Sequence, residues 1–256
     1  MNRIENLFAE KKNNICNIYC TAGFPHLNSI REILDALQKY GADMVEVGIP
    51  YSDPIADGPV IQASNEIALQ NGMNIQRLFE QLKTVRNKIH LPLLLMGYLN
   101  PVMQFGLEKF CRMAKETGVD GVILPDLPLY EFETEYRELF KSHDLDFIFL
   151  VTPETPDERI RKIDLLSTGF IYAVSASATT GNTNSMSTQT AYFKRLQQMN
   201  LKNKILVGFG IRDKETFMEA CKYTNGAIIG SAYIKALQSA NSIEVGTREF
   251  LRKILS

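Results

Sequence analysis

A carboxylate inside an apolar strand is the clearest sign of chemistry in this sequence. Glu46 lies between Val45 and Val47, and Asp57 follows it in a loop rich in proline and glycine. An unpaired buried carboxyl is costly, so a strand that carries one is expected to use it. Apolar surroundings favour the neutral form of a carboxyl and raise its pKa, which suits a general acid or base near neutral pH. Glu46 and Asp57 are therefore the candidate catalytic residues.

Each carboxylate also has a structural explanation that the sequence leaves open. Glu46 fits a buried glutamate bonded to a neighbouring side chain, because charged residues are rarely buried without a partner. Asp57 fits a turn or capping aspartate, which is common beside glycine and proline. Pro54 and Pro59 flank Asp57 and stiffen its loop. The two residue types alone do not choose between these explanations and catalysis.

Three glycine clusters are candidate contacts for a phosphate group. They are Thr179-Thr180-Gly181, Gly208-Phe209-Gly210 and Gly230-Ser231. Glycine lets backbone N–H groups approach an anion closely, and a helix N-terminus adds a favourable dipole. Ser231 adds a hydroxyl donor, and a short helix is expected over Ser231–Leu237. The alternative is that these glycines only make tight turns between strands and helices.

Short apolar runs alternate with longer stretches of helical periodicity along the chain. The expected strands are Ile15–Cys20, Met44–Val47, Leu93–Met96, Gly121–Leu124, Phe147–Val151, Phe170–Val174, Ile205–Gly208 and Ala227–Ile229. The expected helices are Ser29–Tyr40, Ile75–Lys88, Leu107–Thr117, Glu131–Lys141, Pro156–Leu166, Thr188–Met199, Lys214–Tyr223 and Ile243–Leu255. Continuous apolar strands of this kind are typical of a parallel sheet covered by helices.

Eight such strand–helix units predict an α/β fold, a (β/α)8 TIM barrel. No linker or change of composition divides the chain, so a single domain over residues 1–256 is expected. An N-terminal helix at Arg3–Lys11 is expected to cap the bottom of the barrel. An open doubly wound sheet is the main rival, and the count of eight weighs against it. Helix N-caps are expected at Asn28 and Asp213, and a left-handed C-cap at Gly41.

The active sites of such barrels lie at the C-terminal ends of the strands. Glu46 ends the second expected strand, and it points into the barrel mouth if the neighbouring valines face the helices. The glycine clusters follow the last three strands, and loops after strands seven and eight form a recurring phosphate site. The polar stretch Thr179–Gln189 is either an ordinary loop or a lid that closes over a ligand.

Charge and cysteine usage exclude several classes of function. The formal net charge is −1 and no basic block occurs, so nucleic-acid or membrane-surface binding has no electrostatic support. The four cysteines lack the spacing of a zinc site or a disulfide framework, so no metal is expected and a reducing cytoplasmic location fits. No apolar run approaches the roughly 20 residues needed to span a bilayer.

The segment from Val45 to Gly58, Val-Glu-Val-Gly-Ile-Pro-Tyr-Ser-Asp-Pro-Ile-Ala-Asp-Gly, resembles the signature of the tryptophan synthase α subunit family. Further matches follow in order along the chain: Thr21-Ala22-Gly23-Phe24-Pro25, Gly97-Tyr98-Leu99-Asn100-Pro101, Pro125-Asp126-Leu127-Pro128, Gly208-Phe209-Gly210-Ile211 and Gly226-Ala227-Ile228-Ile229-Gly230-Ser231-Ala232. The resemblance implies a carbon–carbon lyase of tryptophan biosynthesis. Its reaction is the retro-aldol cleavage of indole-3-glycerol phosphate to indole and glyceraldehyde 3-phosphate, without a metal or cofactor in this chain.

The resemblance also assigns roles to single residues. It implies that Glu46 is the main acid and base, and that Asp57 accepts from the indole N–H and stabilises the cationic indolenine tautomer. Those roles suit a carboxyl that can be neutral and one that stays charged. The implied substrate contacts are Tyr19, Tyr98, Tyr172 and Phe209 around the indole, Gly181, Gly210, Gly230 and Ser231 around the phosphate, and Thr180 in the lid.

A partner subunit is also implied by the resemblance. Family members pair with a β subunit that holds pyridoxal phosphate, in an αββα heterotetramer, and indole passes between the sites through a tunnel. The Asp53–Gly58 loop and the Asp126–Pro128 segment are then expected to face that partner. No partner of nucleic acid or membrane is implied.

The chain departs from the family pattern after the sixth strand. The family usually reads Ser-Arg-x-Gly-Val-Thr-Gly there, whereas Ala176 and Ala178 replace the arginine and first glycine of this motif. Phe24 likewise replaces a frequent aspartate. Two other functions remain open: another sugar-phosphate barrel, which would want a catalytic lysine on a strand, and a regulatory α-like subunit that has lost its own chemistry.

Overall fold

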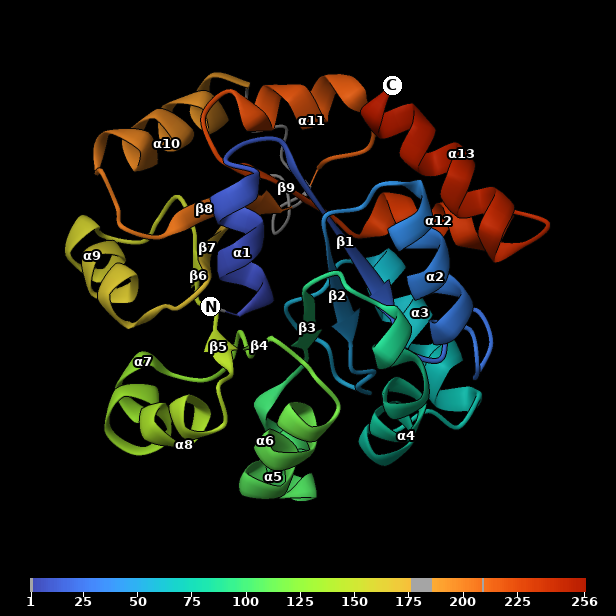
Figure 1. Cartoon of the computed structure of the whole chain (residues 1–256). Helices are drawn as coiled ribbons and strands as arrows, with labels where there is room; N and C mark the ends of the chain where they lie inside the picture. Colours follow the sequence, from blue (N-terminus) through green and yellow to red (C-terminus); the bar gives the residue numbers. More distant parts are fainter. Residues whose placement is uncertain (1, 176–185, 209) are drawn as a thin grey trace.

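Parallel strands form the centre of the computed structural model, and helices surround them (Figure 1). The structure describes residues 2–175, 186–208 and 210–256. The strands are β1 (Ile15–Thr21), β2 (Met44–Gly48), β3 (Leu93–Met96), β4 (Gly121–Ile123), β5 (Asp146–Phe147), β6 (Leu150–Val151), β7 (Phe170–Val174), β8 (Lys204–Gly208) and β9 (Gly226–Ile229). They hydrogen-bond in the order β5-β4-β3-β2-β1-β9-β8-β7-β6.

The sheet closes through β5 and β6, which are two pieces of the fifth expected strand. Between them, Ile148 donates its N–H to the Val122 carbonyl of β4 at 3.1 Å. The Phe149 carbonyl accepts from the Tyr172 N–H of β7 at 3.0 Å. One chain segment thus joins both edges of the sheet, and the predicted (β/α)8 barrel is confirmed.

The helices also follow the expected order. They are α1 (Arg3–Glu10), α2 (Ile30–Tyr40), α3 (Pro59–Gln70), α4 (Ile75–Val85), η1 (Arg86–Lys88), α5 (Leu99–Phe105), α6 (Leu107–Glu116), α7 (Leu129–Glu131), η2 (Phe132–Tyr136), α8 (Arg137–Ser142), α9 (Asp157–Leu166), α10 (Met186–Gln198), α11 (Lys214–Cys221), α12 (Ser231–Ser239) and α13 (Ile243–Leu255). Within the described ranges, no helix is long and apolar enough to cross a membrane.

Two apolar layers hold the barrel together. The outer layer lies between the sheet and the helices and includes Val45 and Val47 of β2. The inner layer fills the barrel and includes Met44 of the same strand. Ile4 and Phe8 of α1 pack into this inner layer, so the expected capping helix closes one end of the barrel (Figure 1).

Helices α3 and α5 were not expected from the sequence. The buried face of α3 includes the polar residues Ser64 and Asn65, which weaken the apolar periodicity that signals a helix. Helix α5 has seven residues and buries only Val102 among them. The helix expected over Glu131–Lys141 contains a π-helical turn, η2, within it.

Two of the expected helix caps are confirmed and one is wrong. Asp213 caps α11 by accepting from the Thr216 N–H at 2.9 Å, and Gly41 ends α2 with φ +99°. Asn28 was wrong as a cap, because Ser29 occupies the N-cap position of α2. The Asn28 side chain instead accepts from the Gln81 amide at 2.9 Å.

Candidate active site

Strand β2 turns Glu46 into the barrel. Its neighbours Val45 and Val47 pack outward against the helices, so alternation directs Glu46 inward. The side chain is fully buried. The sequence-based expectation of an inward carboxyl is therefore confirmed.

One amide contacts this carboxyl. Asn17 of β1 donates from Nδ2 to Oε1 of Glu46 at 2.6 Å. Burial raises the pKa of Glu46 to about 8, and the hydrogen bond from Asn17 opposes that rise. Glu46 is therefore mostly protonated at neutral pH. A neutral carboxyl is able to give a proton to a substrate.

Asp57 is held by a tyrosine at the next strand end. The Tyr98 hydroxyl donates to Oδ2 of Asp57 at 3.1 Å and accepts from the Ala56 N–H at 3.0 Å. The Asp57 carbonyl accepts from Gln62 of α3 at 2.9 Å. Partial burial raises the pKa of Asp57 to about 6, and the Tyr98 bond opposes this rise. Asp57 therefore carries its charge at neutral pH.

Two glycines make room for two inward-facing tyrosines. A Cβ on Gly48 at the end of β2 would overlap the hydroxyl and ring of Tyr19. A Cβ on Gly208 at the end of β8 would overlap the hydroxyl and ring of Tyr172 in the same way. Both tyrosines are buried. The glycines thus fix where these rings lie at the C-terminal ends of the strands.

A cavity of about 70 Å³ opens among these residues. It is lined by Tyr19, Asp57, Ile61, Met96, Tyr172, Gly210, Ile211, Ile228, Gly230 and Ser231. The first, second, third, sixth, seventh and eighth strand–helix units all contribute to this wall. The lining combines aromatic and apolar side chains with a carboxylate and with glycine backbone at the start of α12, a set suited to an aromatic phosphate ester.

The structure brings most expected site residues together, with stated exceptions. Tyr98 contacts Asp57 but is not part of the cavity wall, and neither is the buried Glu46. Thr180, Gly181 and Phe209 lie outside the described residues, as do Ala176 and Ala178. Their expected roles stay predictions.

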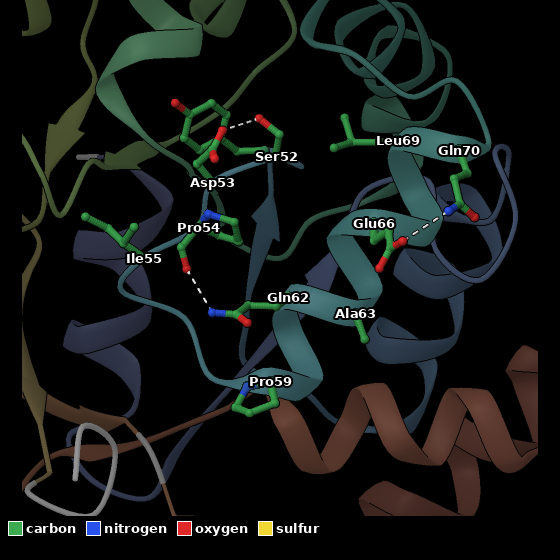
Figure 2. Close-up of a pocket in the computed structure, with 11 residues that line it drawn as sticks. Ser52, Asp53, Pro54, Ile55, Pro59, Gln62, Ala63, Glu66, Leu69 and Gln70 are labelled. Carbon is green, nitrogen blue, oxygen red and sulfur yellow. Dashed lines mark hydrogen bonds between the residues drawn. The ribbon is translucent and has the colours of Figure 1, made fainter.

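A second hollow lies on the outside of the loop after β2. This groove of about 780 Å³ runs between the loop and α3 (Figure 2). Figure 2 shows the Gln62 side chain of α3 directed at the Pro54 carbonyl of the loop. The Gln62 amide donates to that carbonyl at 3.5 Å and so connects the helix to the loop. Ile55 at the loop tip is 87% exposed. The loop tip is therefore open to solvent.

Some residues of the site were not expected from the sequence. Asn17 was treated as part of an apolar strand, although an amide within such a strand is itself a signal. Ile61 was missed because α3 was not expected. Lys204 begins β8, one residue before the strand Ile205–Gly208 that was expected from the sequence. It lies at the N-terminal end of that strand, away from the site. No metal-binding cluster of His, Cys, Asp or Glu is found in the described part of the chain.

Comparison with known proteins gives the family. The family model described as "Tryptophan synthase alpha chain" matches residues 4–254. Proteins of that name from Flavobacterium psychrophilum and Christiangramia forsetii are 52% and 49% identical to this chain; the matches cover 93% and 99% of it, and 94% and 98% of those proteins. A crystal structure of the tryptophan synthase alpha chain from Legionella pneumophila superposes with a TM-score of 0.89 at 30% identity, covering 99% of this chain and 96% of that one. The chain belongs to the tryptophan synthase alpha chain family.

Proposed function

We propose that Glu46 and Asp57 are the catalytic pair of this enzyme. As a family member, the chain is a lyase that cleaves indole-3-glycerol phosphate to indole and glyceraldehyde 3-phosphate in tryptophan biosynthesis. One observation carries the assignment: the pKa of Glu46 is raised to about 8, whereas that of Asp57 is raised only to about 6. At neutral pH one carboxyl therefore holds a proton and the other holds a charge.

This difference matches the two demands of the reaction. Glu46 protonates the indole ring carbon that bears the glycerol chain, which gives a cationic indolenine. Asp57 accepts from the ring N–H and stabilises that cation. The Glu46 carboxylate then takes the proton of the glycerol hydroxyl as the carbon–carbon bond breaks, and the bonding pair returns to the ring. Indole and the aldehyde result, and Glu46 is again protonated.

The cavity wall supports the proposed substrate contacts. Tyr19 and Tyr172 present rings to the space beside Asp57, which suits the flat indole. Gly230 and Ser231 begin α12, so their backbone and hydroxyl donors suit the phosphate. Tyr98 is proposed to orient the Asp57 carboxylate and to flank the indole ring. Further proposed contacts are Phe209 for indole, Gly181 and Gly210 for phosphate, and Thr180 in the lid.

A β subunit is the proposed partner, in an αββα heterotetramer. The exposed Ile55 and the groove along the Asp53–Gly58 loop support docking at this face (Figure 2). Asp126 accepts from the Leu99 N–H at 2.9 Å, which places the Asp126–Pro128 segment beside the same strand ends. The family uses no cofactor in this chain, and pyridoxal phosphate belongs to the β subunit.

Domain organisation and location complete the proposal. The continuous closed sheet, with α13 against α2, supports one domain over residues 1–256. The four cysteines are all free, which supports a reducing, cytoplasmic location.

Indole release by Glu46→Gln and Asp57→Asn variants tests the catalytic pair. We expect Glu46→Gln to abolish release while binding of a phosphate ligand persists, and Asp57→Asn to lose most activity. The assay is run with and without a β subunit, so that a regulatory, inactive α-like chain is distinguished from a lyase. Unchanged turnover of either variant removes that residue from the mechanism.

A further inference from the structure

Asn17 brings an amide into the barrel interior among apolar neighbours. It lies between Ile15 and Tyr19 in β1 and is fully buried. Ile15 belongs to the inner apolar layer. So does Met44 of β2, which pairs with Asn17 in the strand register. Burying an amide in such surroundings is unfavourable unless the amide is hydrogen-bonded. An aliphatic side chain would fill this position at lower cost, so the amide needs an explanation.

Glu46 supplies that explanation. The Asn17 amide reaches Oε1 of Glu46 at 2.6 Å, and both side chains are fully buried. The strand register pairs Tyr19 with Glu46 and Asn17 with Met44. Asn17 therefore lies two residues closer to the N-terminal end of the barrel than the carboxyl does. The hydrogen bond holds Glu46 from the side away from the barrel mouth.

We propose that Asn17 is a positioning residue for Glu46, binding Oε1 so that Oε2 exchanges the proton with the substrate. Oε1 accepts an N–H and so takes the part of the carbonyl oxygen, which leaves the proton of the neutral carboxyl on Oε2. Neither Oε2 of Glu46 nor Oδ1 of Asn17 has a hydrogen-bond partner among the described residues. The one hydrogen bond from the Asn17 amide to Oε1 thus sets the orientation of both side chains. This inference rests on the catalytic role proposed for Glu46.

The pKa of Glu46 can be used to detect the hydrogen bond from Asn17, because no neighbouring group named below changes its charge in the same pH range. Other titratable groups whose pKa values respond to Glu46 are Tyr19 and Cys20 of β1 and Tyr172 of β7. Burial raises the pKa of each, that of Cys20 to about 12, so all three stay neutral where Glu46 titrates. Asp57 is the remaining carboxyl at the cavity, and it is already charged there.

An Asn17→Leu variant tests the proposal because leucine has a similar shape and no donor. We expect kcat to fall about tenfold and KM to change less than about twofold, since the bond orients a reacting group. Loss of a bond that favours the carboxylate should move the alkaline limb of the kcat profile upward by about one pH unit. Ile18→Val, on the outward face of the same strand, controls for altered packing of β1.

A second measurement follows Glu46 directly. Carbon-13 NMR of glutamate-labelled protein, with the Glu46 resonance assigned by its loss in Glu46→Gln, should show the same upward shift of the Glu46 pKa in Asn17→Leu. If leucine prevents folding, Asn17→Met removes the same donor with a more flexible side chain and should give the same upward shift; an unchanged Glu46 pKa in that variant overturns the proposal.

The outcomes separate the two proposals. An unchanged pH limb and an unchanged Glu46 titration in Asn17→Leu, with Glu46→Gln inactive, overturn the positioning role alone. A fully active Glu46→Gln variant overturns the catalytic role of Glu46 and the positioning role together. A merely structural Asn17 would lower the thermal stability of Asn17→Leu while leaving the pH profile in place, and that result also overturns the proposal.

Discussion

Tyr98 donates its hydroxyl hydrogen to Asp57 at 3.1 Å while its oxygen accepts from the N–H of Ala56 at 3.0 Å. One phenol therefore fixes both the side chain of Asp57 and the backbone that precedes it. The bond to Asp57 also keeps the pKa of that carboxyl lower than burial alone would. The charge that the proposed mechanism assigns to Asp57 thus depends on a residue from the following strand end.

Tyr98→Phe should weaken catalysis through Asp57. Without the hydroxyl, the pKa of Asp57 rises above about 6 and its loop loses an anchor. We expect kcat/KM to fall about three- to tenfold, with a larger loss below neutral pH. Steady-state kinetics across pH measure this. Tyr51→Phe is the matched control. The Tyr51 ring packs on the Tyr98 ring with 5.3 Å between the ring centroids, and its hydroxyl accepts a hydrogen bond from Asn100 and makes none with Asp57. Equal effects of both variants would contradict the role of the Tyr98 hydroxyl.

The pH profile of kcat/KM should be bell-shaped. In the proposed mechanism, Asp57 becomes neutral below about pH 6 and no longer stabilises a cation, and above about pH 8 Glu46 loses the proton that it donates. The substrate phosphate also titrates near pH 6. Asp57→Asn resolves this overlap, because its residual activity should lack the acid limb. A limb that persists in that variant belongs to the substrate.

Glu46 should lower the free energy of unfolding as the pH rises towards about 8. Its folded pKa of about 8 exceeds the unfolded value of 4.5, so the folded state binds more protons between these values. Stability therefore falls as pH rises from about 4.5 to about 8. Glu46→Gln removes this penalty and should be more stable than the native chain at the alkaline end, by on the order of 2–4 kcal/mol, with little difference near the unfolded value.

Urea unfolding of the two proteins at both ends of that pH range measures the effect. Glu116→Gln, at an exposed position of α6, removes one carboxylate without burial and serves as control. A stability difference between Glu46→Gln and the native chain that does not grow with pH would show that Glu46 is charged in the folded protein.

The sequence predicted the barrel and the two carboxylates because their signals are local. Apolar strand runs and a glutamate between two valines can be recognised without knowing what lies beside them. The partners of those carboxylates could not be predicted in the same way. Asn17 precedes Glu46 by 29 residues and Tyr98 follows Asp57 by 41, so only the pairing of β2 with β1 and with β3 brings each pair together.

Contacts between segments far apart in the sequence also account for the wrong predictions about the fold. Helix α3 was missed because polar Ser64 and Asn65 face inward, which hides its apolar period. Ser64 is satisfied by Thr21 of β1 at 2.7 Å, a contact that no local pattern reports. The gap between β5 and β6 likewise depends on hydrogen bonds to two different neighbouring strands.

Ser231→Ala should weaken substrate binding more than turnover. The Ser231 side chain lies at the cavity, in the first turn of α12, where a hydroxyl can donate to the phosphate. We expect KM to rise about three- to tenfold with kcat little changed, because this contact is kept from ground state to transition state. Ser239→Ala, at the far end of α12, is the control, since its hydroxyl only bonds the helix backbone. A changed kcat with an unchanged KM would contradict a phosphate contact.

Gly208→Ala should displace Tyr172. Because the new Cβ would overlap the Tyr172 hydroxyl and ring, the ring must leave its position in the cavity wall. Overpacking of this kind costs about 1–3 kcal/mol of unfolding free energy, and indole binding should weaken with it. Gly58→Ala is the stability control, because a Cβ there meets nothing within 4 Å and φ is −75°. Thermal unfolding and indole binding, measured on both variants, check this. If Gly208→Ala matches Gly58→Ala in stability, the glycine is not what makes room for Tyr172.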